Sequence, residues 1–245
     1  MQSELLHNPD FGVVRVAFDQ PGESIVAEAG AMVARDTAMT METNVRGGLG
    51  AALKRKLLGG ESLFQNTFTA TAPGQSLWIA PAPEGAVQQI DLQQGQELLL
   101  QSGAYLASTT GIHLDTKFQG AKGFFSGEGL FLLRAYGEGR LWFSCYGGIH
   151  TVDIGGAAAA HAAAGDAEAA AAGYAGYVCD TAHMVAFTQG LNYRIDKVGG
   201  IKSLFLSGEG LVCRFHGQGR LWMQTRNPGA LASFVNAFRS VQRSN

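Results

Sequence analysis

The chain has 245 residues, of which 46% are hydrophobic and 16% charged, and its formal net charge is −2. This size and apolar content are enough for a substantial core and exclude compositional disorder. Nucleic-acid binding is not expected, because proteins of that class carry a basic excess.

Three cysteines, Cys145, Cys179 and Cys213, are too few for a disulfide framework. They lie in strand-like runs and are interpreted as buried thiols in a reducing compartment. The N-terminus has neither a basic n-region nor an apolar h-region, and no apolar run approaches the ~20 residues of a spanning helix. We therefore expect a soluble, cytoplasmic protein.

Residues 10–85 introduce a pattern of short apolar runs between glycine-rich turns. The run Ser24–Ala27 has the length of a buried strand, and Gly22–Ala34 aligns without gaps with Gly95–Ala107. The chain holds 34 glycines, about twice the average usage of roughly 7%. They fall where tight turns need a residue that tolerates positive φ. This stretch is predicted to be a β unit that the chain repeats.

The stretches 86–147 and 148–226 repeat the unit more clearly. Two blocks recur, Ser126–Leu130 as Ser207–Leu211 and Gly137–Trp142 as Gly217–Trp222. The Gly-Glu-Gly and Gly-Gln-Gly triplets are predicted to be hairpin turns, because a phosphate loop needs a helix N-terminus beside it. Residues 1–226 are thus expected to form one all-β domain of three tandem, pseudo-symmetric units with a sandwich or barrel architecture.

Two segments depart from the repeat. Residues 155–176 are rich in alanine without an apolar stripe, and are interpreted as a surface insertion: an expanded turn, a frayed helix or disorder. Residues 227–243 are predicted to be a C-terminal helix, capped by Asn227 and beginning at Pro228. Its apolar residues have helical spacing: Leu231, Phe234, Val235 and Phe238. This helix is expected to cover an open sheet edge or to pack against a neighbouring subunit.

Several blocks of this sequence resemble the altered-inheritance-of-mitochondria protein 24 family, over roughly residues 3–240. They are Asn8–Phe11, Pro21–Ser24, Glu28–Val33, Gly59–Phe64 and Asp180–Phe187. The resemblance implies units like the tryptophan RNA-binding attenuation protein, in the double-stranded β-helix class, and assembly into a homotrimer. The eukaryotic relative works at the mitochondrial inner membrane. The family has no established catalytic residues, so none is transferred.

The histidines do not form a recognisable metal site, although double-stranded β-helix folds often hold a histidine-based one. The histidines His7, His113, His150, His161, His183 and His216 form no His-x-His pair and sit at non-equivalent places in the units. No Gly-x-Ser-x-Gly elbow and no cysteine in a catalytic context occurs. We therefore expect neither a metal nor another cofactor.

Three carboxylates, Glu61, Glu128 and Glu209, recur at the same place in each unit. They could form a functional triad about a pseudo-threefold axis. Alternatively they are turn residues that accept backbone hydrogen bonds or pair with Arg134 and Arg214. The second interpretation is favoured, because the first unit has no equivalent arginine.

The loop before each of these glutamates is glycine-rich, cationic and partly apolar. Its predicted binding residues are Arg46, Lys54, Arg55 and Lys56 in the first unit, Lys122, Phe124 and Phe125 in the second, and Lys202, Leu204 and Phe205 in the third. If the units are related by a pseudo-threefold, the loops gather at one end and suit an anionic membrane surface or an acidic partner. Alternatively, the apolar residues are ordinary strand starts or lie in a homotrimer interface.

The sequence as a whole favours a non-enzymatic, oligomeric β-scaffold that binds a protein partner or an anionic membrane surface. The alternative is a small-ligand-binding or metal-dependent enzyme of the double-stranded β-helix type. Binding of RNA would need a basic stripe with interleaved aromatic residues. It is not expected, in spite of the fold analogy, because the net charge is slightly acidic and fold alone does not determine function.

Overall fold

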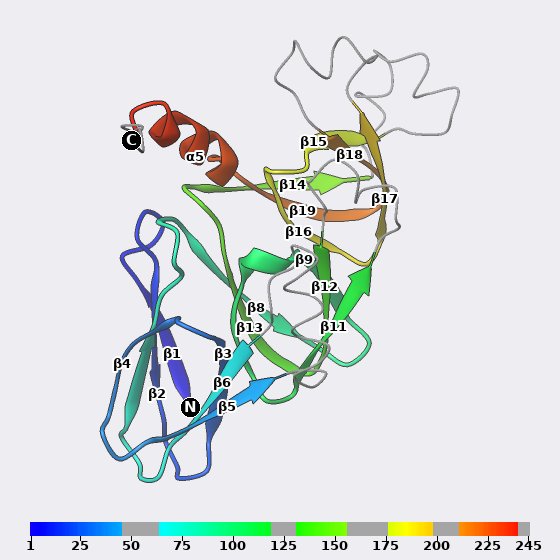
Figure 1. Ribbon diagram of the computed structural model, residues 1–245. Helices are drawn as coiled ribbons and strands as arrows, with labels where there is room; N and C mark the ends of the chain where they lie inside the picture. The colour runs from blue at the N-terminus through cyan, green and yellow to red at the C-terminus, as the bar shows by residue number, and fades with distance from the viewer. Residues whose placement is uncertain (46–63, 119–130, 156–175, 198–210, 240–245) are drawn as a thin grey trace.

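The computed structural model describes residues 1–45, 64–118, 131–155, 176–197 and 211–239. These residues hold nineteen strands, one 3-10 turn (Ser102–Ala104) and one α-helix. The strands form antiparallel sheets that follow one another along the molecule (Figure 1). The predicted all-β class with a short C-terminal helix is confirmed.

After β1 (Gln2–Leu6), the strands fall into three units of six. The first unit comprises β2 (Val13–Ala17), β3 (Ser24–Glu28), β4 (Met32–Arg35), β5 (Thr40–Val45), β6 (Phe64–Thr69) and β7 (Ser76–Ile79). The second comprises β8 (Val87–Leu92), β9 (Glu97–Gln101), β10 (Tyr105–Thr109), β11 (Ile112–Phe118), β12 (Phe131–Gly137) and β13 (Gly139–Ser144). The third comprises β14 (Ile149–Ile154), β15 (Tyr177–Asp180), β16 (Met184–Thr188), β17 (Leu191–Lys197), β18 (Leu211–Gly217) and β19 (Gly219–Gln224).

Every unit is divided between two half-sheets in the same way. Its first, sixth and third strands form half-sheet A, and its second, fifth and fourth strands form half-sheet B. Half-sheet B of one unit joins half-sheet A of the next, through β3 with β10 and through β9 with β16. Two six-stranded sheets result, and each belongs to two units.

The registers confirm the repeat alignment made from sequence. Ala34, Ala107 and Ala186 lie opposite Trp78, Trp142 and Trp222, and each pair follows a register shift at the same place in β4, β10 and β16. Such a bulge re-aims the side chains around it. The predicted hairpin turn is wrong: Gly137 ends β12 and Gly139 begins β13, but these strands belong to different half-sheets and do not pair. The glycine triplet instead forms the corner between the two half-sheets of the unit. A Cβ atom on Gly137 would lie 2.3 Å from the Gly111 carbonyl oxygen, which explains the glycine.

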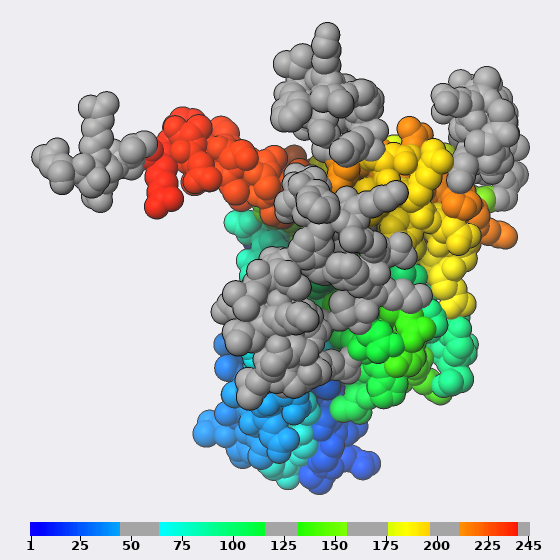
Figure 2. Space-filling model, turned by 45° about the vertical axis from the view of Figure 1, so that its right-hand side comes forward, coloured from blue at the N-terminus to red at the C-terminus, as the bar shows by residue number. Residues whose placement is uncertain are grey.

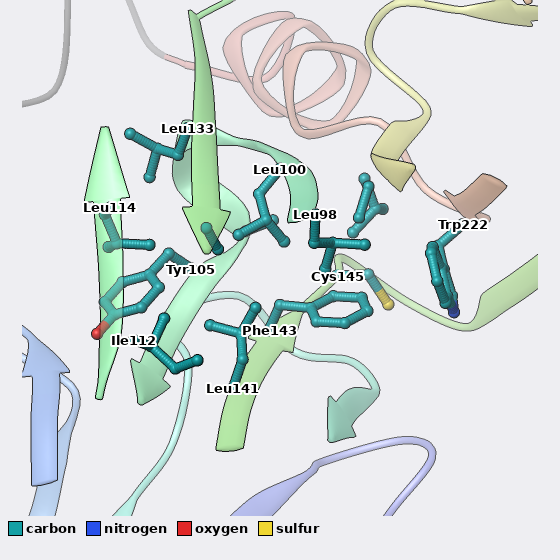
Figure 3. Close-up of a cluster of buried hydrophobic side chains, with 14 of the residues drawn as sticks. Leu98, Leu100, Tyr105, Ile112, Leu114, Leu133, Leu141, Phe143, Cys145 and Trp222 are labelled. Atoms are coloured by element: carbon teal, nitrogen blue, oxygen red, sulfur yellow. The ribbon is translucent and has the colours of Figure 1, made fainter. Parts of the chain in front are cut away.

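The apolar core crosses the boundaries between units. Leu106, Ala107 and Trp142 of the second unit are buried in the core of the first. Val185, Ala186 and Trp222 of the third are buried in the core of the second. Figure 3 shows this core, with Trp222 labelled at one side of it. Its indole packs edge-on against Phe143, with ring centroids 5.7 Å apart. Each of these two cores thus includes residues of the following unit, among them also Val87 in the first core and the partly buried Ile149 in the second.

The C-terminal helix α5 spans Pro228–Asn236, and the Asn227 side chain caps it by accepting hydrogen bonds from the Gly229 and Ala230 amides. The predicted cap is confirmed. The helix ends earlier than the predicted range 227–243, since the following amides bond to carbonyls three residues back and tighten the chain. None of its residues is buried, and Figure 2 shows it extending away from the sheets. It therefore covers no sheet edge of its own chain.

Candidate functional site

The described strands leave one half-sheet unjoined at each end of the molecule. At one end is half-sheet A of the first unit, whose edge is β4; at the other is half-sheet B of the third unit, whose edge is β15. Their equivalents inside the chain, β10 and β16 for β4, and β3 and β9 for β15, are all paired across a unit boundary. Figure 1 places β4 and β15 at opposite ends of the molecule, so they do not pair within one chain. We refer to them as the β4 edge and the β15 edge.

Both edges carry large apolar side chains in solvent. On the β4 edge, Met32 is 41% exposed and Val33 59%; on the β15 edge, Tyr177 is 37% exposed and Val178 48%. The counterparts of Val33, which are Leu106 and Val185, are 0% and 1% exposed. Surface apolar residues occurring singly are ordinary, but these four lie on the strands that the repeat elsewhere covers.

The counterparts of Met32 and Tyr177 follow the same rule, while those of Val178 are buried in one case (Leu99) and partly buried in the other (Val26). Met32 corresponds to Tyr105 and Met184, and Tyr177 to Ile25 and Leu98, all four of which are buried. Tyr105 also donates its hydroxyl to the Val26 carbonyl at 3.0 Å, across the boundary between the first and second units. The exposed residues are therefore those that a following or preceding unit would bury.

Trp78 shows the incomplete state of the first unit most clearly. Its counterparts Trp142 and Trp222 are buried in the core of the preceding unit, whereas Trp78 is only half-buried. The Arg15 guanidinium lies 5.7 Å from its ring centroid. Val33, Ala34 and Trp78 thus occupy the positions whose counterparts lie in a preceding core, and the described residues hold no unit before the first.

The edges are poorly protected against pairing with another strand. Natural sheets block their edges with charged residues, prolines or covering loops. β4 reads Met-Val-Ala-Arg and β15 reads Tyr-Val-Cys-Asp, so each has a single charge, at its last position, and no proline. Both strands can therefore accept a partner strand by main-chain hydrogen bonding.

Two cysteines lie directly opposite one another on β15 and its neighbour β18. Cys179 on β15 is the register partner of Cys213 on β18, and both are buried free thiols. Burial raises the pKa of each thiol to about 12, with a smaller contribution from Asp180. Neutral buried thiols are weak nucleophiles, so this pair behaves as core, as the sequence predicted.

A polar groove of about 370 Å³ lies at the turns of the second unit. It is lined by Gln94, Gly95, Gln96, Glu97, Gly111, His113, Tyr136, Gly137 and Glu138. The Arg134 guanidinium binds Glu97 at 3.1 Å and Asp115 at 2.7 Å, and the hydrogen bond to Asp115 raises the arginine pKa. The His113 ring packs on Tyr136, with centroids 5.6 Å apart. Glu97 is thus engaged in a structural ion pair, and the lining residues include no serine or cysteine that could act as a nucleophile.

The recurring arginines are also structural. Arg140 and Arg220 follow the glycine triplets and bind their register partners Asp91 and Asp153, at 2.9 and 2.7 Å. Arg214 binds Asp196 at 2.9 Å. These pairs join neighbouring strands of one half-sheet, and exposed pairs of this kind contribute little to stability.

The residues predicted from sequence to bind a partner or membrane all lie outside the described residues. They are Arg46, Lys54, Arg55, Lys56, Lys122, Phe124, Phe125, Lys202, Leu204 and Phe205, together with the recurring Glu61, Glu128 and Glu209. The alanine-rich segment lies outside as well, except for its first and last residues. Where the chain is described, no group of three potential metal ligands occurs. No helix in the described ranges is long and apolar enough to cross a membrane.

The two edges were not predicted from the sequence, although a signal for them exists. The alignment of 22–34 with 95–107 already sets Met32 and Val33 against Tyr105 and Leu106. What was missing is the order of strands within a unit, which tells that these positions lie at a boundary between units. Without it, an apolar pair at the start of the chain looks like ordinary core.

The fold and its edges define an all-β repeat protein whose three units share sheets and cores with their neighbours. A family model described as mitochondrial biogenesis AIM24 matches residues 3–164 and 156–226. The chain belongs to this AIM24 family, whose biochemical role is not established.

Two streptococcal proteins are similar to this chain. An uncharacterized protein, M6_Spy0233, of Streptococcus pyogenes serotype M6 is 27% identical over 225 residues, which cover 89% of this chain and 82% of the relative. The crystal structure of protein SPYM3_0169 from Streptococcus pyogenes superposes with a TM-score of 0.74 at 24% identity. It covers 97% of this chain and 99% of that protein, and it supports the fold alone.

Proposed function

We propose that this protein is a non-enzymatic β-scaffold that assembles head-to-tail from copies of itself, with the β15 edge of one copy paired to the β4 edge of the next. The observation that carries the proposal is the exposure of Met32, Val33, Tyr177 and Val178. The counterparts of the first three are buried at the boundaries within the chain, and those of Val178 are buried (Leu99) or partly buried (Val26). A junction between copies would repeat those boundaries. It would also complete the third core with Val33, Ala34 and Trp78 of the next copy.

The internal boundaries predict the register of the junction. Ala107 lies opposite Ala27 and Ala186 opposite Leu100, while Ser108 lies opposite Val26 and Phe187 opposite Leu99. Transferred to the free edges, these pairs set Ala34 against Cys179, Arg35 against Val178, and Asp36 against Tyr177. The three-stranded sheet β15-β18-β17 of one copy would then be continuous with the four-stranded sheet β1-β2-β7-β4 of the next, which gives seven strands with β1 at one outer end.

Such an interface joins two different surfaces, so repeated copies either close into a ring or extend as a filament. The homotrimer that the family resemblance implies is the closed form. Closure leaves neither edge open, which removes the aggregation risk of an exposed strand. Binding of an acidic partner or an anionic membrane to the cationic loops stays a prediction from sequence, because those loops lie outside the described residues.

Disulfide trapping tests the register. Ala34→Cys would face the native Cys179 of the next copy, and a second variant, Arg35→Cys with Val178→Cys, tests the neighbouring pair. Opposite Cα atoms in antiparallel strands lie ~4.5–5.5 Å apart, within the range of a disulfide. Thr37→Cys is the matched control, because its register position has no cysteine opposite it.

The expected result is a covalent ladder of joined copies from at least one of the two variants after mild oxidation, and none from the control. Trapping that is equally efficient at position 37 would mean random collision and would refute the register. Absence of any joined species at concentrations where the protein is associated would refute the edge pairing.

A further inference from the structure

The helix α5 presents the largest exposed apolar face of the described residues. Leu231, Phe234 and Val235 of α5, with Phe238 in the turn that follows it, are 44–75% exposed, and Phe234 and Phe238 are in edge-to-face contact at 5.1 Å. Figure 2 shows the helix standing off the sheets, and its apolar residues are exposed in the described part of the chain. Four adjoining large apolar side chains in solvent mark a contact site.

The position of α5 in the chain indicates what lies next to it. The segments that lead into successive units hydrogen-bond to one another: Gly12 donates to Gly85, Ala86 to Gly147, and Thr225 to Gly148, each at 2.9 Å. In the first two boundaries the chain runs on into the next unit. After Thr225 it runs into α5 instead, which therefore begins where a fourth unit would begin.

In a head-to-tail assembly this place belongs to the first unit of the next copy. The loop 7–12 leads into that unit, as 84–86 leads into the second unit and 145–148 into the third. The loop is held to the second unit through Asn8, whose side-chain oxygen accepts from the Val87 amide at 2.8 Å. Its one large apolar side chain, Phe11, is 66% exposed. The next copy thus brings an unpartnered phenylalanine to the start of α5.

The composition of the helix distinguishes a protein partner from a membrane. Helices that lie on membranes carry lysine or arginine on their polar face. The face of α5 opposite the apolar residues holds Gly229, Ser233 and Asn236, and no residue from 228 to 236 is charged; the nearest described arginines, Arg226 and Arg239, lie outside the helix. An uncharged, small-residue face fits a helix packed on protein.

The small size of the paired edges is a further reason to expect a second contact between the copies. The paired edges alone offer three register pairs and four large apolar side chains, without the covalent link that holds the internal boundaries. Stable interfaces bury upwards of ~1,000 Å² in total. The α5 face adds two phenylalanines, and a buried aromatic side chain covers ~150–250 Å².

We infer that α5 is a latch of the head-to-tail junction, whose apolar face packs on the 7–12 loop of the next copy with Phe11 as its counterpart. This inference rests on the proposed function, because it assumes that the next copy follows the third unit. Helix and edge would make two separate contacts with the same neighbour, one by apolar packing and one by main-chain pairing.

The latch is tested with Phe234→Glu and Phe238→Glu together. Ser233→Glu with Asn236→Glu is the matched control, with the same added charge on the opposite face. Sedimentation should give a dissociation constant raised at least about tenfold for the first pair and unchanged for the control. Ala34→Cys with the native Cys179 should still trap a disulfide in the latch variant at high concentration, since the edges remain.

A photoreactive phenylalanine analogue at position 238, in mixed light and heavy copies, identifies the contact. The expected cross-link joins residue 238 of one copy to the 7–12 peptide of another. Cross-links confined to one chain would overturn the latch. An unchanged dissociation constant of the Phe234/Phe238 variant would also overturn the latch, but it would not contradict the pairing of the β4 and β15 edges. Loss of pelleting with anionic vesicles at unchanged mass would assign the helix to a membrane and also overturn it. A wild-type protein that never associates would instead refute the proposed function itself.

Discussion

Replacing Val33 with aspartate should dissociate the assembly without unfolding the chain. Val33 is 59% exposed in the single chain, and its counterparts Leu106 and Val185 are 0% and 1% exposed. Burying a whole valine contributes ~1.5–3 kcal/mol, so covering the exposed part contributes about 1–2 kcal/mol to the junction. A carboxylate at the same place would be buried without a partner, which adds a penalty of several kcal/mol.

Together these changes amount to at least about 3 kcal/mol, and every 1.4 kcal/mol is about a tenfold change in affinity, so the dissociation constant should rise by about 100-fold or more. Sedimentation velocity over a dilution series measures it, and circular dichroism with thermal unfolding checks the fold. Met41→Asp is the control, since Met41 is 45% exposed on β5, away from both edges. An assembly of Val33→Asp as tight as the wild type would refute the reasoning.

Further predictions concern other parts of the molecule. Dilution should shift tryptophan emission to longer wavelength, because Trp78 is half-buried in a single chain while the other two indoles stay buried; Trp78→Phe should abolish the shift. Cys179 and Cys213, whose pKa burial raises to about 12, are neutral thiols at pH 8, so native protein should react with iodoacetamide far more slowly than denatured protein. Equal rates would contradict their burial. The loop hypothesis expects charge reversal at 54–56 to reduce pelleting with anionic vesicles; equal pelleting of both proteins, or of neither, would exclude the membrane interpretation.

Much of the fold could be predicted from the sequence, because the repeat leaves local signals. Glycines at fixed places marked turns, although these turns are corners between half-sheets and not hairpins. The recurring Leu-Trp blocks aligned the units, but they did not reveal which strands pair. Asn227 and Pro228 located the start of α5 through capping chemistry. The end of the helix was less predictable, because the residues after Asn236 continue the apolar spacing while the chain tightens into a turn.

The candidate site could not be predicted in the same way. The loops chosen from sequence stood out by composition, which says what a segment could bind and not what its neighbours already cover. The β4 and β15 edges have ordinary strand compositions. They become unusual only when the strand order is known, since that order decides whether Val33 or Val178 meets another unit or solvent.

The mass of the full chain in solution tests the central claim most directly. Light scattering at micromolar concentration and moderate salt should give a discrete multiple of the 25.8 kDa chain, with the trimer as the closed form. Val33→Asp should return it to a single chain. A wild-type protein that keeps a mass of 25.8 kDa up to high concentration, with both edges exposed, would contradict the account.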